Sequence, residues 1–162
     1  MNKESNQSIL DIETKANKQP IYQDFIHLTT HTLLPCTTTE KSRSLPPLEE
    51  FIHSLSERTK LSSPTLLLSV LYLLRLKTKL PATAKGASDT PYRLFLASIL
   101  TSSKYLCDQH SLTSRRLSEM TVYSAKEINS MERSFLSLLR YDLWVTTDHL
   151  GEVLMKIKKK PD

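Results

Sequence analysis

The stretch that decides the fold reads Pro91-Tyr-Arg-Leu-Phe-Leu-Ala-Ser-Ile-Leu-Thr-Ser-Ser-Lys-Tyr-Leu-Cys-Asp108. It mixes large apolar residues with small ones, and small side chains let neighbouring helices approach closely. The small residues are Ala97, Ser98, Ser102 and Ser103. We therefore expect this stretch to form the central helix of a helical bundle, with the cation Lys104 among apolar neighbours near its end.

Residues that begin helices recur on both sides of this stretch. Proline is tolerated in the first helical turn, and a Ser or Thr just before it caps free backbone N–H groups. Such signals occur at Pro47 with Glu49 and Glu50, at Ser62 with Pro64, at Thr90 with Pro91, and at the capping box Ser124-Ala-Lys-Glu127. Ser63-Pro64 and Thr90-Pro91 also suit proline-directed phosphorylation, but capping explains them better. With two glycines in 162 residues, β-hairpin turns are disfavoured, and the sequence predicts an all-α fold.

Apolar residues repeat at helical spacing between these starts. One stripe consists of Leu48, Phe51, Ile52 and Leu55, and residues 66–76 are apolar almost all round, as in a helix surrounded by others. A shorter helix is expected over 112–120, with Leu117 and Met120 in the core. The helix after Ser124 carries two adjacent stripes, the first made of Ile128, Met131, Phe135 and Leu138, the second of Glu132, Leu136, Leu139 and Leu143. This helix can therefore serve the core and a partner at once.

These signals divide the chain into five parts. We expect a disordered leader over 1–20, an N-terminal amphipathic helix over 21–36, a polar linker over 37–44, a five-helix domain over 45–145, and a C-terminal helix with a basic tail over 146–162. Thr146 or Thr147 is expected to cap the last helix.

Composition and charge favour a soluble intracellular protein. No apolar stretch reaches the length of a membrane span, and the polar N-terminus lacks a signal peptide. The net charge of +5 is a mild excess, and much of it comes from the run Lys156-Ile-Lys-Lys-Lys160, which reads as a solvated end. Cys36 and Cys107 are far apart and are interpreted as reduced thiols.

The residue types that perform catalysis or bind metals do not cluster in this sequence. His27 and His31 have the spacing of two zinc ligands on one helix face, but no third ligand is near, so zinc is disfavoured. None of the histidines has a nucleophile or a carboxylate at a meaningful spacing. We expect no catalytic residues, no metal and no cofactor.

Four motifs closely resemble the fungal PHO/PCL-type cyclins. They are Tyr72-Leu-Leu-Arg-Leu-Lys-Thr-Lys-Leu-Pro81, Thr90-Pro-Tyr-Arg-Leu-Phe95, Ser103-Lys-Tyr-Leu-Cys-Asp108 and Glu127-Ile-Asn-Ser-Met-Glu132. The resemblance implies a single cyclin box of five helices over 45–145, flanked by the N-terminal and C-terminal helices. It also implies a non-catalytic subunit that forms a heterodimer with a cyclin-dependent serine/threonine kinase, activates it, and helps to direct it to protein substrates or inhibitors. Nuclear or cytoplasmic residence comes from the family alone.

The resemblance also implies which residues bind the kinase. In cyclins, the lysine and glutamate at the positions of Lys104 and Glu132 hold the flanks of the kinase helix that carries the active-site glutamate. The positions of Tyr105, Leu136, Tyr141 and Leu143 present apolar contacts to the same helix. This chain departs from the family pattern at three positions, namely Leu117 for a frequent tryptophan, Val122 for a small residue and Leu74 for a polar one.

Three other functions are weighed against kinase regulation. A cyclin-fold scaffold or a transcription-related module would use the same helices without activating a kinase. A nucleic-acid binder rests only on Arg115, Arg116 and the lysine tail, and it ranks last among the binding functions. An enzyme is the weakest of all.

Overall fold

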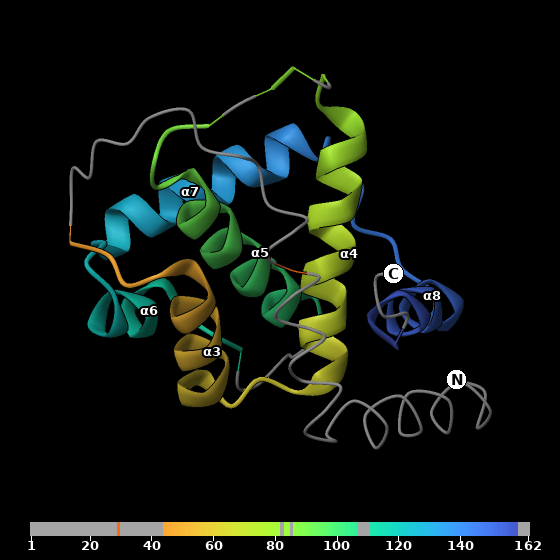
Figure 1. The fold of residues 1–162 in the computed structure, drawn as a ribbon, viewed down its shortest axis with the longest axis horizontal. Helices are drawn as coiled ribbons and strands as arrows, with labels where there is room; N and C mark the ends of the chain where they lie inside the picture. Colours follow the sequence, from red (N-terminus) through yellow and green to blue (C-terminus); the bar gives the residue numbers. More distant parts are fainter. Residues whose placement is uncertain (1–28, 30–43, 82, 85, 107–110, 159–162) are drawn as a thin grey trace.

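Six α-helices and no β-strand are found in the part of the chain that the computed structural model describes, which is residues 29, 44–81, 83–84, 86–106 and 111–158 (Figure 1). The helices are α3 (Leu48–Thr59), α4 (Ser63–Lys79), α5 (Thr90–Leu106), α6 (Ser114–Met120), α7 (Ala125–Leu138) and α8 (Thr147–Lys158). The predicted all-α fold is therefore confirmed. Five of these helices, α3 to α7, lie within the span expected for the five-helix domain.

The central helix of the bundle is α5, as predicted. It contacts α3, α4 and α7, and Figure 1 shows it surrounded by these elements. Its small residues Ala97, Ser98, Ser102 and Ser103 are all buried, so neighbouring helices pack close to its backbone. The hydroxyl of Ser103 also accepts the backbone N–H of Leu112 at 2.7 Å, which ties the end of α5 to the segment before α6.

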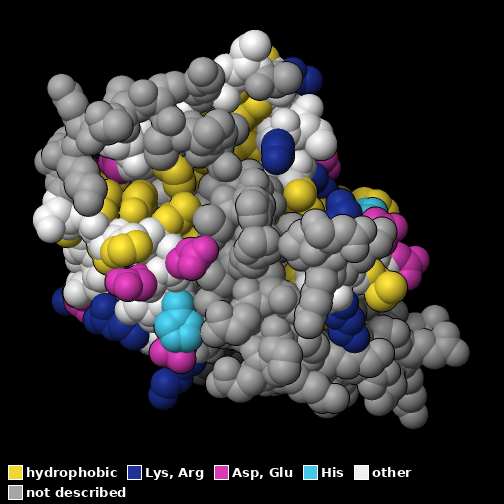
Figure 2. Space-filling view, in the orientation of Figure 1, with side chains coloured by type: hydrophobic (Ala, Val, Ile, Leu, Met, Phe, Trp, Pro, Cys, Tyr) yellow, Lys and Arg dark blue, Asp and Glu magenta, His cyan; other side chains and the backbone are white. Residues whose placement is uncertain are grey.

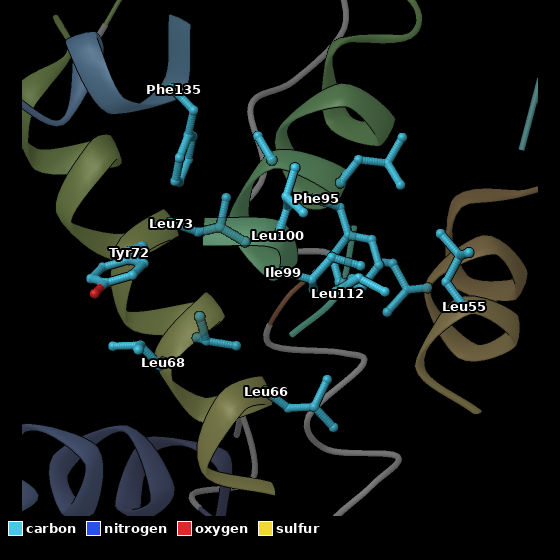
Figure 3. Close-up of a cluster of buried hydrophobic side chains, with 14 of the residues drawn as sticks. Leu55, Leu66, Leu68, Tyr72, Leu73, Phe95, Ile99, Leu100, Leu112 and Phe135 are labelled. Atoms are coloured by element: carbon cyan, nitrogen blue, oxygen red, sulfur yellow. The ribbon is translucent and has the colours of Figure 1, made fainter. Parts of the chain in front are cut away.

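The hydrophobic core is centred on α4 and α5. Leu66, Leu68, Tyr72 and Leu73 of α4 meet Phe95, Ile99 and Leu100 of α5 in one cluster, which Leu55, Leu112 and Phe135 complete (Figure 3). The ring of Tyr72 is fully buried, yet its hydroxyl oxygen points out of the cluster (Figure 3). The opposite side of α4 packs against α8, so α4 is covered on both sides, as its apolar sequence predicted.

Most of the predicted helix starts are confirmed. The Ser62 hydroxyl accepts the N–H of Thr65, and both bonds of the capping box between Ser124 and Glu127 are present. Thr146 caps α8, because its hydroxyl accepts the N–H of His149 at 3.2 Å. Ser63 is buried at this first turn, which fits capping better than phosphorylation.

Two helix starts differ from the prediction by one residue. Thr90 was expected to cap α5 but is its first residue, and the carbonyl of Asp89 accepts the N–H of Arg93 at 3.1 Å. The Asp89 carboxylate also accepts the hydroxyl of Tyr123 at 3.0 Å, so this residue fixes the helix start against another segment. In the same way, Pro47 lies just before α3 rather than in its first turn.

The core stripe of α7 ends at a different leucine from the one predicted. Ile128, Met131 and Phe135 are buried as expected, but Leu138 is 46% exposed while Leu139 is fully buried. The prediction continued the stripe by three residues from Phe135, whereas the helix continues it by four. Helix α7 ends at Leu138, and the next residue turns into the core.

Several predictions concern residues outside the described part of the chain. These are the leader, most of the N-terminal helix and of the polar linker, His27, His31, Cys36 and Cys107, and the last residues of the basic tail. Thr29 is described within the predicted N-terminal helix, and it is helical and fully buried. Among the described residues, none of the helices is long and apolar enough to cross a membrane.

Candidate partner-binding surface

Lys104 and Glu132, which the sequence singled out on separate helices, form a direct ion pair. Lys104 lies in the last turn of α5 and Glu132 in the middle of α7, which packs against α5. The Lys104 Nζ lies 2.8 Å from Oε1 of Glu132. The lysine side chain is 47% exposed and the glutamate side chain 14%. Lys104 thus emerges at the helix end and stays half-exposed, whereas the carboxylate of Glu132 is largely buried.

Tyr105 and Leu143 are brought together by a third residue, Tyr72. The rings of Tyr72 and Tyr105 meet edge to face with centroids 6.4 Å apart, and the Tyr105 ring remains exposed. The Tyr72 hydroxyl donates to the carbonyl of Leu143 at 2.8 Å. The end of α5 and the linker after α7 therefore lie on opposite sides of one tyrosine.

Leu136 and Tyr141 complete the group of predicted residues. Leu136 lies one turn after Glu132 on α7, and its carbonyl accepts the N–H of Tyr141 at 3.0 Å. Tyr141 is 64% exposed. The structure thus connects all six predicted residues, and we call them the candidate docking surface: Lys104, Tyr105, Glu132, Leu136, Tyr141 and Leu143.

The linker that follows α7 is strained at two residues. Arg140 and Tyr141 have φ angles of 56° and 55°, in the left-handed region that residues with a Cβ rarely occupy. Such a conformation costs about 1–2 kcal/mol per residue. Backbone hydrogen bonds offset part of this cost, since Arg140, Tyr141 and Asp142 donate to the carbonyls of the last turn of α7 and of Leu139.

Side chains of α4 bind this linker, and the sequence analysis did not identify them as part of the site. The Arg75 Nη1 donates to the carbonyl of Asp142 at 2.9 Å, and the Lys79 Nζ lies 3.1 Å from the carboxylate of the same residue. Tyr72, Arg75 and Lys79 are three and four residues apart, so they share one face of α4. A tyrosine and two cations at this spacing in an otherwise apolar helix are the sequence signal that could have indicated this polar face of α4.

Burial and charge shift two pKa values within this group. Burial, and then the neighbouring Tyr105, raise the pKa of Tyr72 well above its usual range, which keeps the hydroxyl a hydrogen-bond donor. The hydrogen bond from Lys79 lowers the pKa of Asp142 below its usual range, and Arg75 adds to that effect. Both groups therefore remain in the protonation state that the contacts need at neutral pH.

The start of α8 adds an exposed aromatic residue beside this surface. Trp144 follows Leu143 directly, is largely exposed, and meets the ring of His149 edge to face at 5.5 Å. His149 Nδ1 accepts the N–H of Thr146 at 3.2 Å and lies 3.5 Å from Nη2 of Arg75. Sequence reasoning did not single out Trp144, because nothing in the pattern shows whether a lone tryptophan is inside or outside.

None of the three residues that depart from the family pattern belongs to the ion pair. Leu117 is fully buried and forms part of the core, Val122 is exposed in the turn before α7, and Leu74 is half-buried. Within the described ranges, no three His, Cys, Asp or Glu side chains are grouped so that they could hold a metal. The candidate docking surface combines the ion pair with the exposed rings of Tyr105 and Tyr141.

Comparisons with known proteins agree with this architecture. The family described as Cyclin, N-terminal domain matches residues 14–144. PHO85 cyclin-1 of Saccharomyces cerevisiae is 35% identical over 147 residues, and PHO85 cyclin-2 and PHO85 cyclin-9 of the same yeast are 26% and 29% identical over 145 and 149 residues. The alignments cover 82%, 84% and 85% of this chain and 52%, 47% and 48% of the relatives. The chain thus spans about half the length of the curated relatives it matches.

The family match includes the whole of α3 to α7, and with them every residue of the candidate docking surface. The similarity to three yeast PHO85 cyclins confirms the resemblance to fungal PHO/PCL-type cyclins that the motifs indicated. The chain belongs to the cyclin family and carries its N-terminal, all-α domain in the form found in fungal PHO85 cyclins.

Proposed function

We propose that this chain is a non-catalytic regulatory subunit that binds and activates a cyclin-dependent serine/threonine kinase of the PHO85 type. The similarity to three yeast proteins that are named PHO85 cyclins supports this choice of partner. The candidate docking surface is the proposed contact. Recruitment of protein substrates or inhibitors to the kinase is part of the proposal, through a surface to which we assign no residues.

The observation that carries the proposal is the ion pair between Lys104 and Glu132. An ammonium has three N–H donors, of which the bond to Glu132 uses one, and each carboxylate oxygen accepts more than one bond. The pair can therefore donate to backbone carbonyls and accept backbone N–H groups of a second chain. Tyr105 follows Lys104 in the chain, and Tyr141 donates its N–H to the carbonyl of Leu136, one turn after Glu132. Both rings are exposed and would help to exclude water from those bonds. Charge-assisted hydrogen bonds contribute about 1.5–3 kcal/mol each.

Activation would follow from binding one kinase conformation better than another. A protein kinase is active when its regulatory helix brings a glutamate to the lysine that holds the ATP phosphates. A subunit that grips this helix in its inward position shifts the equilibrium by its differential affinity for the two states. This role requires no catalytic group on the cyclin.

The test is kinase binding by two single variants and a matched control. Lys104→Ala and Glu132→Ala are expected to weaken co-purification with the kinase sharply, because each leaves the other charge desolvated in the complex, at a cost of about 2–5 kcal/mol. Arg115 and Glu119 form an exposed ion pair on α6 at 3.7 Å, so Arg115→Ala and Glu119→Ala remove the same charges elsewhere. Unchanged binding in both Lys104→Ala and Glu132→Ala would remove this surface from the proposal.

Kinase activity separates the proposal from its alternatives. A regulatory subunit stimulates phosphorylation of a protein substrate when it is added to the purified kinase, whereas a cyclin-fold scaffold does not. On the face drawn in Figure 2, Lys and Arg side chains lie in separate groups with Asp and Glu near several of them. This distribution does not favour a nucleic-acid surface. An affinity for nucleic-acid duplexes that falls steeply as the salt concentration rises would nevertheless support that alternative.

A further inference from the structure

We propose that Tyr72, Arg75 and Lys79 of α4 position the candidate docking surface by holding the linker between α7 and α8. These three residues act through the linker rather than by touching the kinase. The inference rests on the proposed function, and it adds to it the part of the molecule that fixes the shape of the surface.

The contacts of α4 with the linker converge on two neighbouring residues. Tyr72 donates to the carbonyl of Leu143 at 2.8 Å, and Arg75 donates to the carbonyl of Asp142 at 2.9 Å. Lys79 lies 3.1 Å from the Asp142 carboxylate. Asp142 and Leu143 are the two residues that follow Tyr141, so the contacts fix the backbone on its C-terminal side.

The strained backbone at Tyr141 explains why the linker needs these contacts with α4. Arg140 and Tyr141 both occupy the left-handed region, where glycine would be expected. A linker released from α4 would leave this unfavourable conformation for others, and the Tyr141 ring would then spread over several positions. A partner that binds one of them would have to order the linker, which weakens binding.

The low exposure of Arg75 and Lys79 favours a positioning role over direct contact with the kinase. The side chains of Arg75 and Lys79 are 16% and 24% exposed, and the ring of Tyr72 is buried. Arg75 also lies over the Tyr72 ring, with its guanidinium carbon 5.9 Å from the centroid. These side chains are occupied with the linker and with each other, whereas Tyr141 presents its ring to the surroundings.

The experiment is a double-mutant cycle on kinase affinity, measured with the full chain. Asp142→Ala removes the partner of Lys79 and is expected to weaken binding by roughly fivefold, the loss that follows when an interface segment must be ordered on binding. In a Tyr141→Ala background the same change is expected to have no further effect, because residues that act through one another are not additive. Glu119→Ala, which removes a carboxylate from the α6 ion pair, is the matched control.

Two results would overturn the inference. One is an Asp142→Ala affinity equal to that of the wild type while Lys104→Ala still weakens binding; the proposed function then stands and the positioning role fails. The other is an equal loss from Asp142→Ala with and without Tyr141, which would make Asp142 an independent contact. If Lys104→Ala and Glu132→Ala both leave affinity unchanged, the candidate docking surface is not the kinase contact, and if the chain does not stimulate the kinase, the proposed function itself fails. Both failures are distinct from failure of the positioning role.

A second variant tests the same role from the α4 side. Tyr72→Phe keeps the buried ring but removes the hydrogen bond to the Leu143 carbonyl. We expect weaker kinase binding, and again no added loss in a Tyr141→Ala background. A Tyr72→Phe affinity equal to that of the wild type would exclude Tyr72 from the positioning group.

Discussion

The hydroxyl of Tyr72 on α4 donates to the carbonyl of Leu143, 2.8 Å away and 71 positions later in the sequence. The ring that carries this hydroxyl is fully buried between α4 and the rest of the core. The bond therefore joins the hydrophobic interior to the linker that displays Tyr141. Each side of this connection can be perturbed separately.

Tyr72→Phe is expected to lower the free energy of unfolding by about 1 kcal/mol at neutral pH, because one buried hydrogen bond is lost without a change in packing. The pKa of Tyr72 is raised above its ordinary value of 10.0, chiefly by burial. A raised pKa contributes stability that is present below the ordinary value and is lost as the pH rises above it.

The difference in stability between wild type and Tyr72→Phe should therefore shrink above pH 10.0. Urea denaturation of both proteins at neutral pH and at about pH 11 measures it. A gap that stays constant over this range would contradict the raised pKa.

Leu139→Ala and Leu138→Ala form a matched pair at the end of α7. Leu139 is fully buried and Leu138 is 46% exposed. Loss of a buried leucine side chain leaves a cavity, so Leu139→Ala should lower the free energy of unfolding by about 2–4 kcal/mol. Leu138→Ala should change it by less than about 0.5 kcal/mol. Chemical denaturation of both variants measures the difference, and equal effects would show that the leucines are wrongly placed.

The two glycines of the chain are expected to respond in opposite ways to alanine. A Cβ at Gly86 would lie 2.5 Å from the Cβ of Thr90, so Gly86→Ala should destabilise the protein by about 1–3 kcal/mol. A Cβ at Gly151 on α8 would meet nothing within 4 Å, so Gly151→Ala should stabilise it by about 0.5–1 kcal/mol. Thermal unfolding distinguishes the two, and a stabilising Gly86→Ala would refute the close approach.

Arg140→Gly should raise the free energy of unfolding by about 0.5–1 kcal/mol, because glycine adopts a φ of 56° without a Cβ penalty. Its control is Arg133→Gly, since Arg133 is exposed in the interior of α7. There glycine should lower the same quantity by about 1 kcal/mol. Urea denaturation of both variants is the measurement. Destabilisation by Arg140→Gly would mean that its side chain contributes more than its backbone conformation costs.

Local signals predicted much of the fold. Proline, serine and threonine at helix starts act through backbone N–H groups within one turn, so Ser62 and Ser124 were identified from neighbouring residues alone. The cap of α8 was narrowed to Thr146 or Thr147, and it is Thr146. The small residues of α5 likewise predicted a central helix. Errors arose where a neighbouring residue took the predicted role. Asp89 replaces Thr90 just before the start of α5, and Leu139 replaces Leu138 as the last buried leucine after Phe135.

The candidate docking surface was predicted only in part. The resemblance to cyclins indicated its six residues, and the structure brings them together, with Lys104 paired to Glu132. The residues of α4 that hold the linker were not predicted, because contacts across more than sixty positions leave no local pattern. The left-handed Arg140 and Tyr141 were also unforeseen, since neither is a glycine or an asparagine.

Tyr72 is buried in the core and is also hydrogen-bonded to the linker, and this has a consequence for mutational screens. A search for variants that lose the partner should recover substitutions inside the bundle, along α4, as readily as substitutions on the exterior. Such variants would keep every exterior side chain and still bind the partner more weakly, because the proposed placement of Tyr141 depends on the bond from the Tyr72 hydroxyl to the linker.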